Sequence, residues 1–232
     1  MSERFGKYDQ RQYHTVDVAA GYAEWAKIYD RSVDRRLDLD LLKTLENVPW
    51  GILENAVDLG CGTGRIGAWL RRRGAVRVAG LDRSPAMLKR AARKGRYAGL
   101  AIGDVARAPF ADAHFDLAIS VLATCHVADI RAFYGEAARL VRPGGYVVLV
   151  DYHPFMLVRG IPTHFKTEAG TQLAIKNWVH FFEDHVAAAR ACGLALLEMR
   201  ERMVDRAWIR AKPGMGSIAN EPVSFAMVWR RE

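Results

Sequence analysis

From residue 55 onward, short β-rich runs alternate with segments of helical periodicity, and this alternation limits the choice of fold more than any other feature of the chain. Strands that alternate with helices predict a mostly parallel sheet with helices packed on both faces. The expected strands cover residues 55–59, 76–81, 100–103, 115–121, 146–150, 194–200 and 223–229. A length of 232 residues suits one domain with additions, so we expect a single α/β domain over residues 1–232.

Helix signals lie between the expected strands. Ser84 is typical of an N-cap, and Asp129 can cap the helix that the apolar spacing predicts over residues 130–141. A helical pattern also covers residues 174–192. We expect residues 1–50, which are rich in aromatic side chains, to form a helical extension of the domain.

The first expected strand runs into a glycine-rich turn. The segment reads Asp58-Leu59-Gly60-Cys61-Gly62-Thr63-Gly64, with Arg65 next. Such a turn between a strand and a helix lets a ligand approach the backbone and the helix N-terminus. The dinucleotide-binding pattern would place a glycine where Arg65 stands. A carboxylate at Asp58 would repel a pyrophosphate and suit a positively charged ligand, which weakens a dehydrogenase interpretation.

Two further acids follow expected strands. Asp82 lies 22 residues after Gly60, the approximate spacing at which an acid binds ribose hydroxyls in nucleotide sites. Asp104 follows the third expected strand and could accept a hydrogen bond from an adenine amino group. Each acid alone could be a helix cap. Three acids in successive strand–helix units, however, indicate one ligand site along the carboxyl edge of the sheet.

These residues resemble the class I, Rossmann-like S-adenosylmethionine-dependent methyltransferases. The resemblance covers about residues 22–151, and it adds Leu140-Val141-Arg142-Pro143-Gly144-Gly145 to the glycine turn and the acids. It implies a seven-stranded sheet whose last strand, residues 223–229, is antiparallel. It also implies a helical N-terminal lid that contains Tyr22 and Tyr29 and closes over the cofactor.

The same resemblance implies roles for individual residues toward S-adenosylmethionine, and toward S-adenosylhomocysteine as the product. Asp58 and the backbone near Gly60 would hold the methionine end, Asp82 the ribose, and Asp104 with Val105 the adenine. The full set of expected cofactor-binding residues is Tyr22, Tyr29, Asp58, Gly60, Cys61, Gly62, Gly64, Asp82, Arg83, Met87, Asp104, Val105, Ser120, Val121 and Leu122.

Methyl transfer to a protonated nucleophile requires a base, and two histidines follow adjacent expected strands. His126 follows the fourth strand and His153 the fifth, so their side chains could converge above the methyl group. We expect one of them to be the catalytic base and prefer His153. A structural or surface histidine is the competing explanation for each.

The acceptor pocket is expected to draw on residues 151–222 and on aromatic side chains. The candidate substrate-binding residues are Trp25, Tyr152, Phe155, His164, Trp178 and Trp208. These side chains would enclose a mostly apolar pocket for a small, ring-containing metabolite methylated on oxygen, nitrogen or carbon. Some of them could equally belong to the core. No histidine or carboxylate spacing suggests a metal, so none is expected.

Composition bounds the alternatives. A net charge of +8 keeps an RNA methyltransferase open, although the basic residues fall on several separate segments, so nucleic acid is not the expected partner. A non-catalytic S-adenosylmethionine-binding regulatory module is a third possibility. The three scattered cysteines do not suggest a disulfide framework, and no apolar run could span a bilayer. We therefore expect a cytoplasmic protein; its oligomeric state is left open.

Overall fold

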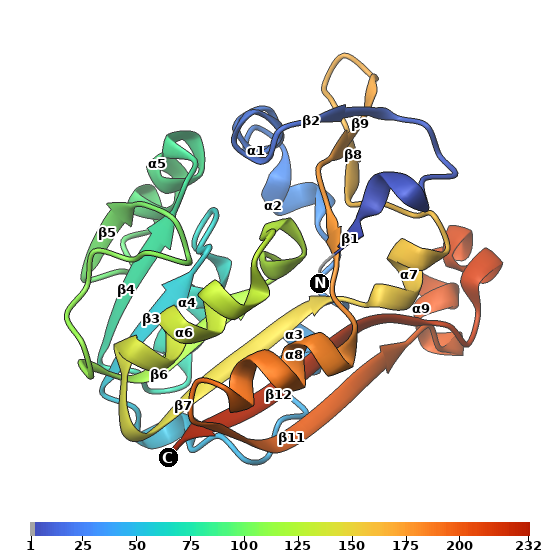
Figure 1. Ribbon diagram of the computed structural model, residues 1–232. Coiled ribbons are helices and arrows are strands. Elements are labelled where there is room, and N and C mark those ends of the chain that lie inside the picture. The colour runs from blue at the N-terminus through green and yellow to red at the C-terminus, as the bar shows by residue number, and fades with distance from the viewer. Residues whose placement is uncertain (1–2) are drawn as a thin grey trace.

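The computed structural model describes residues 3–232, and its central feature is a seven-stranded sheet (Figure 1). The strand order is β11-β12-β7-β6-β3-β4-β5. The bounds are β3 (Asn55–Leu59), β4 (Arg77–Asp82), β5 (Gly99–Ile102), β6 (Phe115–Val121), β7 (Val141–Tyr152), β11 (Leu194–Met203) and β12 (Pro222–Arg231). The strands β3 to β7 pair in parallel, whereas β12 is antiparallel to both β7 and β11. The predicted fold, including the antiparallel last strand, is confirmed.

Helices cover both faces of this sheet, as the figure shows. The longer ones are α4 (Arg65–Arg72), α5 (Pro85–Lys94), α6 (Ile130–Leu140) and α8 (Phe182–Arg190). Ser84 and Asp129 are N-caps as predicted, since Ser84 Oγ accepts from the Met87 N–H and Asp129 Oδ1 from two backbone N–H groups of α6. These bonds satisfy donors that have no partner within the helix.

The core consists of two apolar layers, one on each face of the sheet. Successive residues of β7 alternate between them: Val147 and Leu149 pack in the layer under α6, and Val148 and Val150 pack in the layer under α4. This follows from the two-residue period of a strand. The central strands are apolar on both faces because helices cover both sides.

The remaining elements lie around the sheet domain, most of them beyond its carboxyl edge (Figure 1). The N-terminal segment contains β1 (Glu3–Arg4), η1 (Phe5–Lys7), β2 (His14–Val16), α1 (Val18–Trp25), α2 (Tyr29–Ser32), α3 (Leu39–Leu42) and η2 (Trp50–Ile52). The later segments are η3 (Thr124–His126), α7 (Pro154–Val158), β8 (His164–Lys166), β9 (Gln172–Ile175), β10 (Trp178–Val179), α9 (Arg206–Ala211) and η4 (Pro213–Ile218). Within residues 3–232, no helix is long and apolar enough to cross a membrane.

Two of the sequence-based secondary-structure predictions are wrong in part. Residues 1–50 are not uniformly helical, because β2 pairs in parallel with β9 and β1 pairs with β10. The helix predicted over residues 174–192 begins only at Phe182, and the preceding residues form β9 and β10. Pairing between segments distant in the sequence therefore overrides the local helical pattern.

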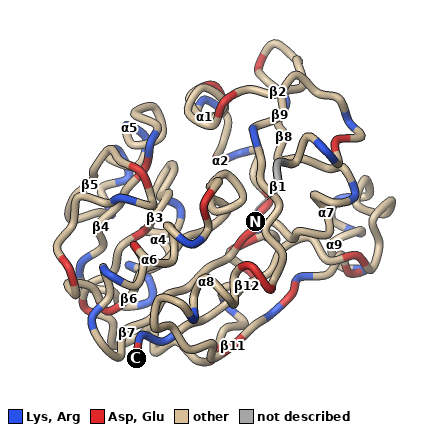
Figure 2. Tube along the Cα trace, in the orientation of Figure 1, with Lys and Arg blue, Asp and Glu red and all other residues tan. Residues whose placement is uncertain are grey.

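The charged residues are distributed over the whole chain. Figure 2 shows Lys and Arg on the N-terminal segment, on the helices of the sheet domain and on the C-terminal elements, with Asp and Glu among them. The excess of 34 basic over 26 acidic residues thus does not gather along a single element.

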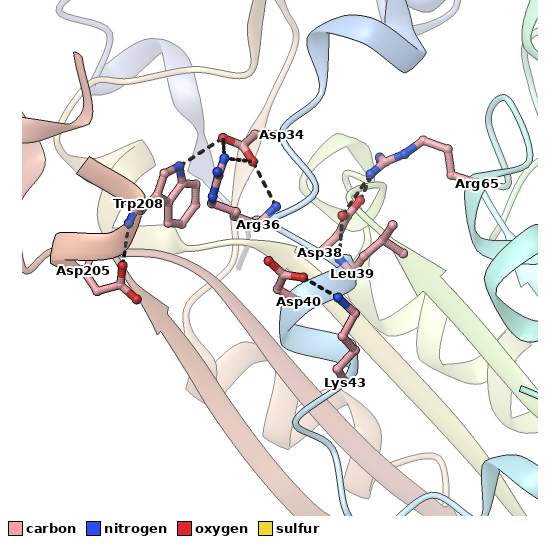
Figure 3. Close-up of polar contacts among 9 residues, drawn as sticks. All are labelled: Asp34, Arg36, Asp38, Leu39, Asp40, Lys43, Arg65, Asp205 and Trp208. Carbon is pink, nitrogen blue, oxygen red and sulfur yellow. Dashed lines mark hydrogen bonds and ion pairs between the residues drawn. The ribbon is translucent and has the colours of Figure 1, made fainter. Parts of the chain in front are cut away.

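One buried ion pair ties the N-terminal segment to the sheet domain. Arg65, at the start of α4, lies with Nη1 2.8 Å from Asp38 Oδ2, the N-cap of α3 (Figure 3). The Asp38 side chain is 1% exposed and that of Arg65 is 15% exposed. Lys94 forms a second, more exposed pair with Asp30 at 2.8 Å. The residue that replaces glycine in the dinucleotide pattern therefore anchors the N-terminal segment.

We expect Arg65→Met to lower the free energy of unfolding by about 3 kcal/mol, because the variant leaves the buried Asp38 carboxylate uncompensated. Urea unfolding at neutral pH measures this loss. Lys43→Met is a matched control, because the exposed Lys43–Asp40 pair of the same segment should contribute under about 1 kcal/mol. Equal losses in the two variants would show that the Arg65 pair is no special anchor.

Candidate active site

A cavity of about 290 Å³ opens at the carboxyl ends of β3, β4 and β6. We call it the first cavity. It is lined by Val18, Tyr22, Tyr29, Gly60, Gly62, Asp82, Arg83, Asp104, Val105, Ala106, Val121, Leu122, Ala123, His126, Val127, Ala128, Asp129 and Trp178. The parallel strands bring these residues together because their carboxyl ends share one edge of the sheet.

The glycine turn forms one wall of this cavity through its backbone. Gly60 and Gly62 have φ values of 80° and 51°, in the left-handed region. A Cβ added at Gly60 would lie 2.7 Å from the Cβ of Ala123, on the loop that follows β6. Glycine is therefore needed at Gly60 both for the turn and for its close packing against the neighbouring loop.

The acids Asp82 and Asp104 line the first cavity, as the sequence predicted. Asp82 accepts one backbone hydrogen bond on each oxygen, from the Gly62 N–H and the Ser84 N–H, both at 2.8 Å. Asp104 accepts from the Ala106 N–H and lies 3.4 Å from Arg83. Each oxygen of Asp82 keeps a lone pair, so this carboxylate can still accept hydrogen bonds from a ligand.

Asp58 lies behind the glycine turn rather than at its mouth. Its side chain is fully buried and lines neither this cavity nor the second one described below. Oδ2 accepts a hydrogen bond of 2.6 Å from the Tyr97 hydroxyl, whereas Oδ1 has no partner among the described residues. Burial raises the pKa of Asp58 to about 7, the Tyr97 hydrogen bond opposes this rise, and the charge of Asp82 adds to it.

Four other expected cofactor residues also lie outside the lining of the first cavity: Cys61, Gly64, Met87 and Ser120. Ser120 donates to the carbonyl of Leu59 from a buried position. The backbone of Gly64 caps α4, and Met87 packs against the N-terminal aromatic residues. These residues therefore lie behind those that line the first cavity.

Tyr22 and His126 meet at the rim of the first cavity. The Tyr22 hydroxyl lies 2.9 Å from His126 Nε2, and His126 Nδ1 lies 2.7 Å from the carbonyl oxygen of Lys176. A carbonyl only accepts, so Nδ1 carries the proton and Nε2 accepts from Tyr22. Burial lowers the pKa of His126, although the carbonyl contact and Asp151 oppose this, and the imidazole is therefore neutral at pH 7.

Asp151, at the end of β7, holds the turn that presents His126. Its Oδ2 accepts from the Cys125 N–H at 2.8 Å and from the Thr124 hydroxyl. The side chain of Asp151 is buried, and Thr124 and Cys125 belong to the same short helix, η3, as His126. No sequence pattern predicted this support.

A second cavity, of about 370 Å³, adjoins the first. Tyr22, Tyr29 and Leu122 line both cavities. The expected substrate residues Trp25, Tyr152, His164 and Trp208 all line the second cavity. Trp178 lines the first cavity instead, and Phe155 is 41% exposed and lines neither.

His153 is not where the sequence interpretation expected it. It lines neither cavity and is the N-cap of α7, where Nδ1 accepts from the Phe155 N–H at 3.0 Å. Its other ring nitrogen, Nε2, therefore donates to Glu201 Oε1 at 2.8 Å. Pro154 starts a helix directly after β7, and this turns the imidazole toward β11 instead of the pocket.

Several residues of the second cavity were missed by sequence reasoning: Arg11, Ser32, Val33, Asp34, Leu37, Cys125, Met156, Ile161, Pro162, Thr163, Lys212, Gly214, Met215, Ser217, Ile218 and Val223. Apart from Cys125 in η3 and Val223 in β12, they come from the N-terminal segment, from the region around α7 and from the loop between β11 and β12. No local pattern links three such distant segments. Among residues 3–232, no group of three His, Cys, Asp or Glu side chains could hold a metal ion.

The raised pKa of Asp58 gives a pH dependence that can be tested. A folded-state pKa of about 7, against about 3.9 in the unfolded chain, means that the folded protein binds more protons between these values. The contribution of Asp58 to the free energy of unfolding should therefore fall as pH rises from 4 to 7. Asp58→Asn removes this term, so its stability relative to the original protein should increase between pH 5 and pH 8.

Urea unfolding of both proteins at these two pH values measures the difference. Tyr97→Phe is the companion variant: it removes the hydrogen bond that favours the carboxylate and should move the transition to higher pH. Parallel stability curves for the original protein and Asp58→Asn would contradict the assignment.

Comparison with known proteins gives the family. A family model described as "Methyltransferase domain" matches residues 57–149, which run from β3 to β7. The sequence is 26% identical to an uncharacterized methyltransferase of Emericella nidulans, over 97% of this chain and 92% of that protein. It is 32% identical to the malonyl-[acyl-carrier protein] O-methyltransferase of Serratia marcescens, over 56% of this chain and 51% of that protein.

The fold of the chain is also similar to that of a solved methyltransferase. An S-adenosylmethionine-dependent methyltransferase from Mesorhizobium loti superposes with a TM-score of 0.69 at 25% identity, and the match covers 84% of this chain and 98% of that one. The structural match agrees with the observed strand order, and the matched family model includes the glycine turn that lines the first cavity. The chain belongs to the class I S-adenosylmethionine-dependent methyltransferases, enzymes whose cofactor is S-adenosylmethionine.

Proposed function

We propose that this methyltransferase acts on a small, ring-containing molecule that binds in the second cavity. The observation that carries the proposal is the junction of the two cavities at Tyr22, Tyr29 and Leu122. A molecule in the second cavity would therefore lie next to a ligand in the first. The aromatic wall formed by Trp25, Tyr152 and other side chains favours a planar, largely apolar acceptor.

In this proposal, the whole chain is one methyltransferase domain with two pocket-forming additions. Residues 1–50 contribute Tyr22, Trp25 and Tyr29, and residues 151–222 contribute most of the opposite wall. The relatives differ in their acceptors: one is named for a malonyl-[acyl-carrier protein] and another for demethylmenaquinone. The acceptor atom of this enzyme is accordingly proposed as oxygen, nitrogen or carbon.

The residues of the first cavity fit S-adenosylmethionine. When bound, this cofactor supplies an electrophilic methyl group on a positively charged sulfur. Asp82 would accept hydrogen bonds from the ribose hydroxyls, and Asp104 with Val105 would bind the adenine. The exposed backbone of Gly60 and Gly62 would contact the methionine end, because no side chain there blocks its approach.

We assign the base role to His126 acting through Tyr22. The neutral Nε2 of His126 already accepts the Tyr22 hydroxyl proton, and Tyr22 lines both cavities. An acceptor hydroxyl or amine would donate its proton to the Tyr22 oxygen while the Tyr22 proton moves to His126. Asp151 would keep His126 in place through η3, and the Lys176 carbonyl would fix its tautomer.

Asp82→Ala should weaken S-adenosylhomocysteine binding by about 1–3 kcal/mol, because the variant loses hydrogen bonds to the charged carboxylate. Isothermal titration calorimetry gives the affinity. Asp112→Ala is the control, since this acid is 76% exposed and lines neither cavity. S-adenosylhomocysteine should also raise the melting temperature, whereas NAD should not. Unchanged affinity in Asp82→Ala would remove Asp82 from the site.

His126→Ala should lower turnover by about a hundred- to ten-thousandfold, because a positioned base is lost. His153→Ala should keep turnover within a few-fold and reduce mainly stability, because His153 caps α7. Turnover is measured as S-adenosylhomocysteine release, with an acceptor found by screening hydroxylated and aminated aromatic compounds.

Tyr22→Phe tests whether Tyr22 relays a proton to His126 or only contributes to the cavity wall. It should lower turnover and change its pH profile, while calorimetry shows S-adenosylhomocysteine still bound. Near-normal turnover in both His126→Ala and Tyr22→Phe would mean that positioning alone carries the rate.

A further inference from the structure

We propose that the second cavity contains an anion-binding subsite formed by Arg11 and Lys212, and that the methyl acceptor carries a carboxylate or phosphate group there. The inference rests on the proposed use of this cavity as the acceptor pocket and goes further, because it names the chemical class of the acceptor. Neither cation was among the residues expected at the site.

The two cations reach the cavity from segments far apart in the sequence. Arg11 lies in the N-terminal segment before β2, and Lys212 lies between α9 and η4. Both line the second cavity and both are exposed, which places them at its mouth. The N–H group at Arg11 Nη1 donates to the Tyr13 hydroxyl at 3.4 Å, and the Tyr13 ring packs 5.4 Å from the ring of His164 in the cavity wall.

The charges of these two residues have no acidic partner within residues 5–232. Among residues 5–232, whose side chains the structure describes, neither Arg11 nor Lys212 forms an ion pair. Other basic residues do form such pairs, for example Arg159 with Glu221. A positive charge at a cavity mouth is thus available to a ligand.

Asp34 is the acid that lines the same cavity, and its carboxylate is already compensated. Arg36 Nη1 lies 3.1 Å from Oδ1, and the Trp208 indole donates to Oδ2 at 3.0 Å (Figure 3). Lys212 contributes to the field at Asp34 but makes no ion pair with it. The lining therefore keeps an excess of positive charge.

The positive charges of Arg11 and Lys212 also act on His164. Burial is the first cause that lowers its pKa, the Pro162 carbonyl opposes the shift, and the charges of Arg11 and Lys212 lower the pKa further. Both cations are thus close enough to act on one imidazole of the cavity wall. Its Nδ1 donates to the Pro162 carbonyl at 2.8 Å, so Nε2 is the acceptor nitrogen of the ring.

The remaining walls define the rest of the acceptor. Trp25, Tyr152, Met156 and Ile161 are aromatic or aliphatic, so an apolar body would lie against them while its acidic group reaches the mouth. A guanidinium matches carboxylate and phosphate oxygens with two parallel hydrogen bonds, and an ammonium adds a compact charge. An amphipathic aromatic acid or phosphate satisfies both parts of the cavity.

The test compares matched probes on the protein saturated with S-adenosylhomocysteine. The probes are 4-hydroxybenzoate, phenyl phosphate and the neutral 4-hydroxybenzamide, and calorimetry gives each dissociation constant. We expect each acidic probe to bind about tenfold or more tightly than the amide. The double variant Arg11→Gln/Lys212→Gln should abolish this preference. The control Arg93→Gln/Arg190→Gln has the same change in net charge on exposed residues outside both cavities and should keep it.

Equal binding of acid and amide, or binding of neither, would overturn the subsite. So would a preference that persists in the double variant. A short RNA could instead bind through Arg11 and Lys212 and compete with phenyl phosphate. That result would assign the subsite to the phosphates of a nucleic acid and overturn the proposal of a small acidic acceptor. Failure of the proposed function has a different signature: no S-adenosylhomocysteine release from any hydroxylated or aminated compound, charged or neutral.

Discussion

The hydrogen bonds that join the turn after β3 to the end of β4 fix the geometry on which the site depends. The Gly60 and Cys61 N–H groups both donate to the Leu81 carbonyl, at 2.8 and 2.9 Å, and the Gly62 N–H donates to Asp82. A left-handed backbone at Gly60 permits this arrangement and lets the loop after β6 pack against it. Three neighbouring strands thereby end in one surface of backbone and carboxylates, which is what a ribose- and amine-bearing cofactor requires.

The N-terminal segment completes the lining of both cavities because it is held by α4 of the sheet domain and by β9 of a separate three-stranded sheet. The buried Asp38–Arg65 pair fixes it beside α4, and β2 pairs in parallel with β9. These contacts place Tyr22 between the two cavities and within hydrogen-bond distance of His126. Asp151 fixes the other side of that contact by holding η3. The N-terminal segment, the Tyr22–His126 contact and the wall between the two cavities thus depend on the same few polar contacts between distant segments.

Prediction from sequence succeeded where the signal was local or followed from one sheet edge. Apolar strands that alternate with helices are recognisable in the sequence, because helices cover both faces of such a sheet. The capping residues Ser84 and Asp129 are recognisable from their place before a helix. Asp82 and Asp104 follow their strands, so the shared carboxyl edge brings them to one cavity. Asp58 follows the same rule in sequence, yet it lies inside β3 and turns toward Tyr97, a contact that strand position alone does not specify.

Residue periodicity and a short contiguous motif are enough to predict the sheet and the glycine turn. The family, and with it the antiparallel last strand, follows from the resemblance that this motif and the acids carry. That His126 lines the first cavity and His153 lines neither cavity is visible only in the folded protein. Both histidines follow strands, and their orientations depend on partners 50 and 48 residues away, the Lys176 carbonyl and Glu201. The second cavity likewise forms only when the N-terminal segment packs against the region around α7 and the loop between β11 and β12, which lie more than a hundred residues further along the chain. No local pattern encodes contacts that are made across such distances.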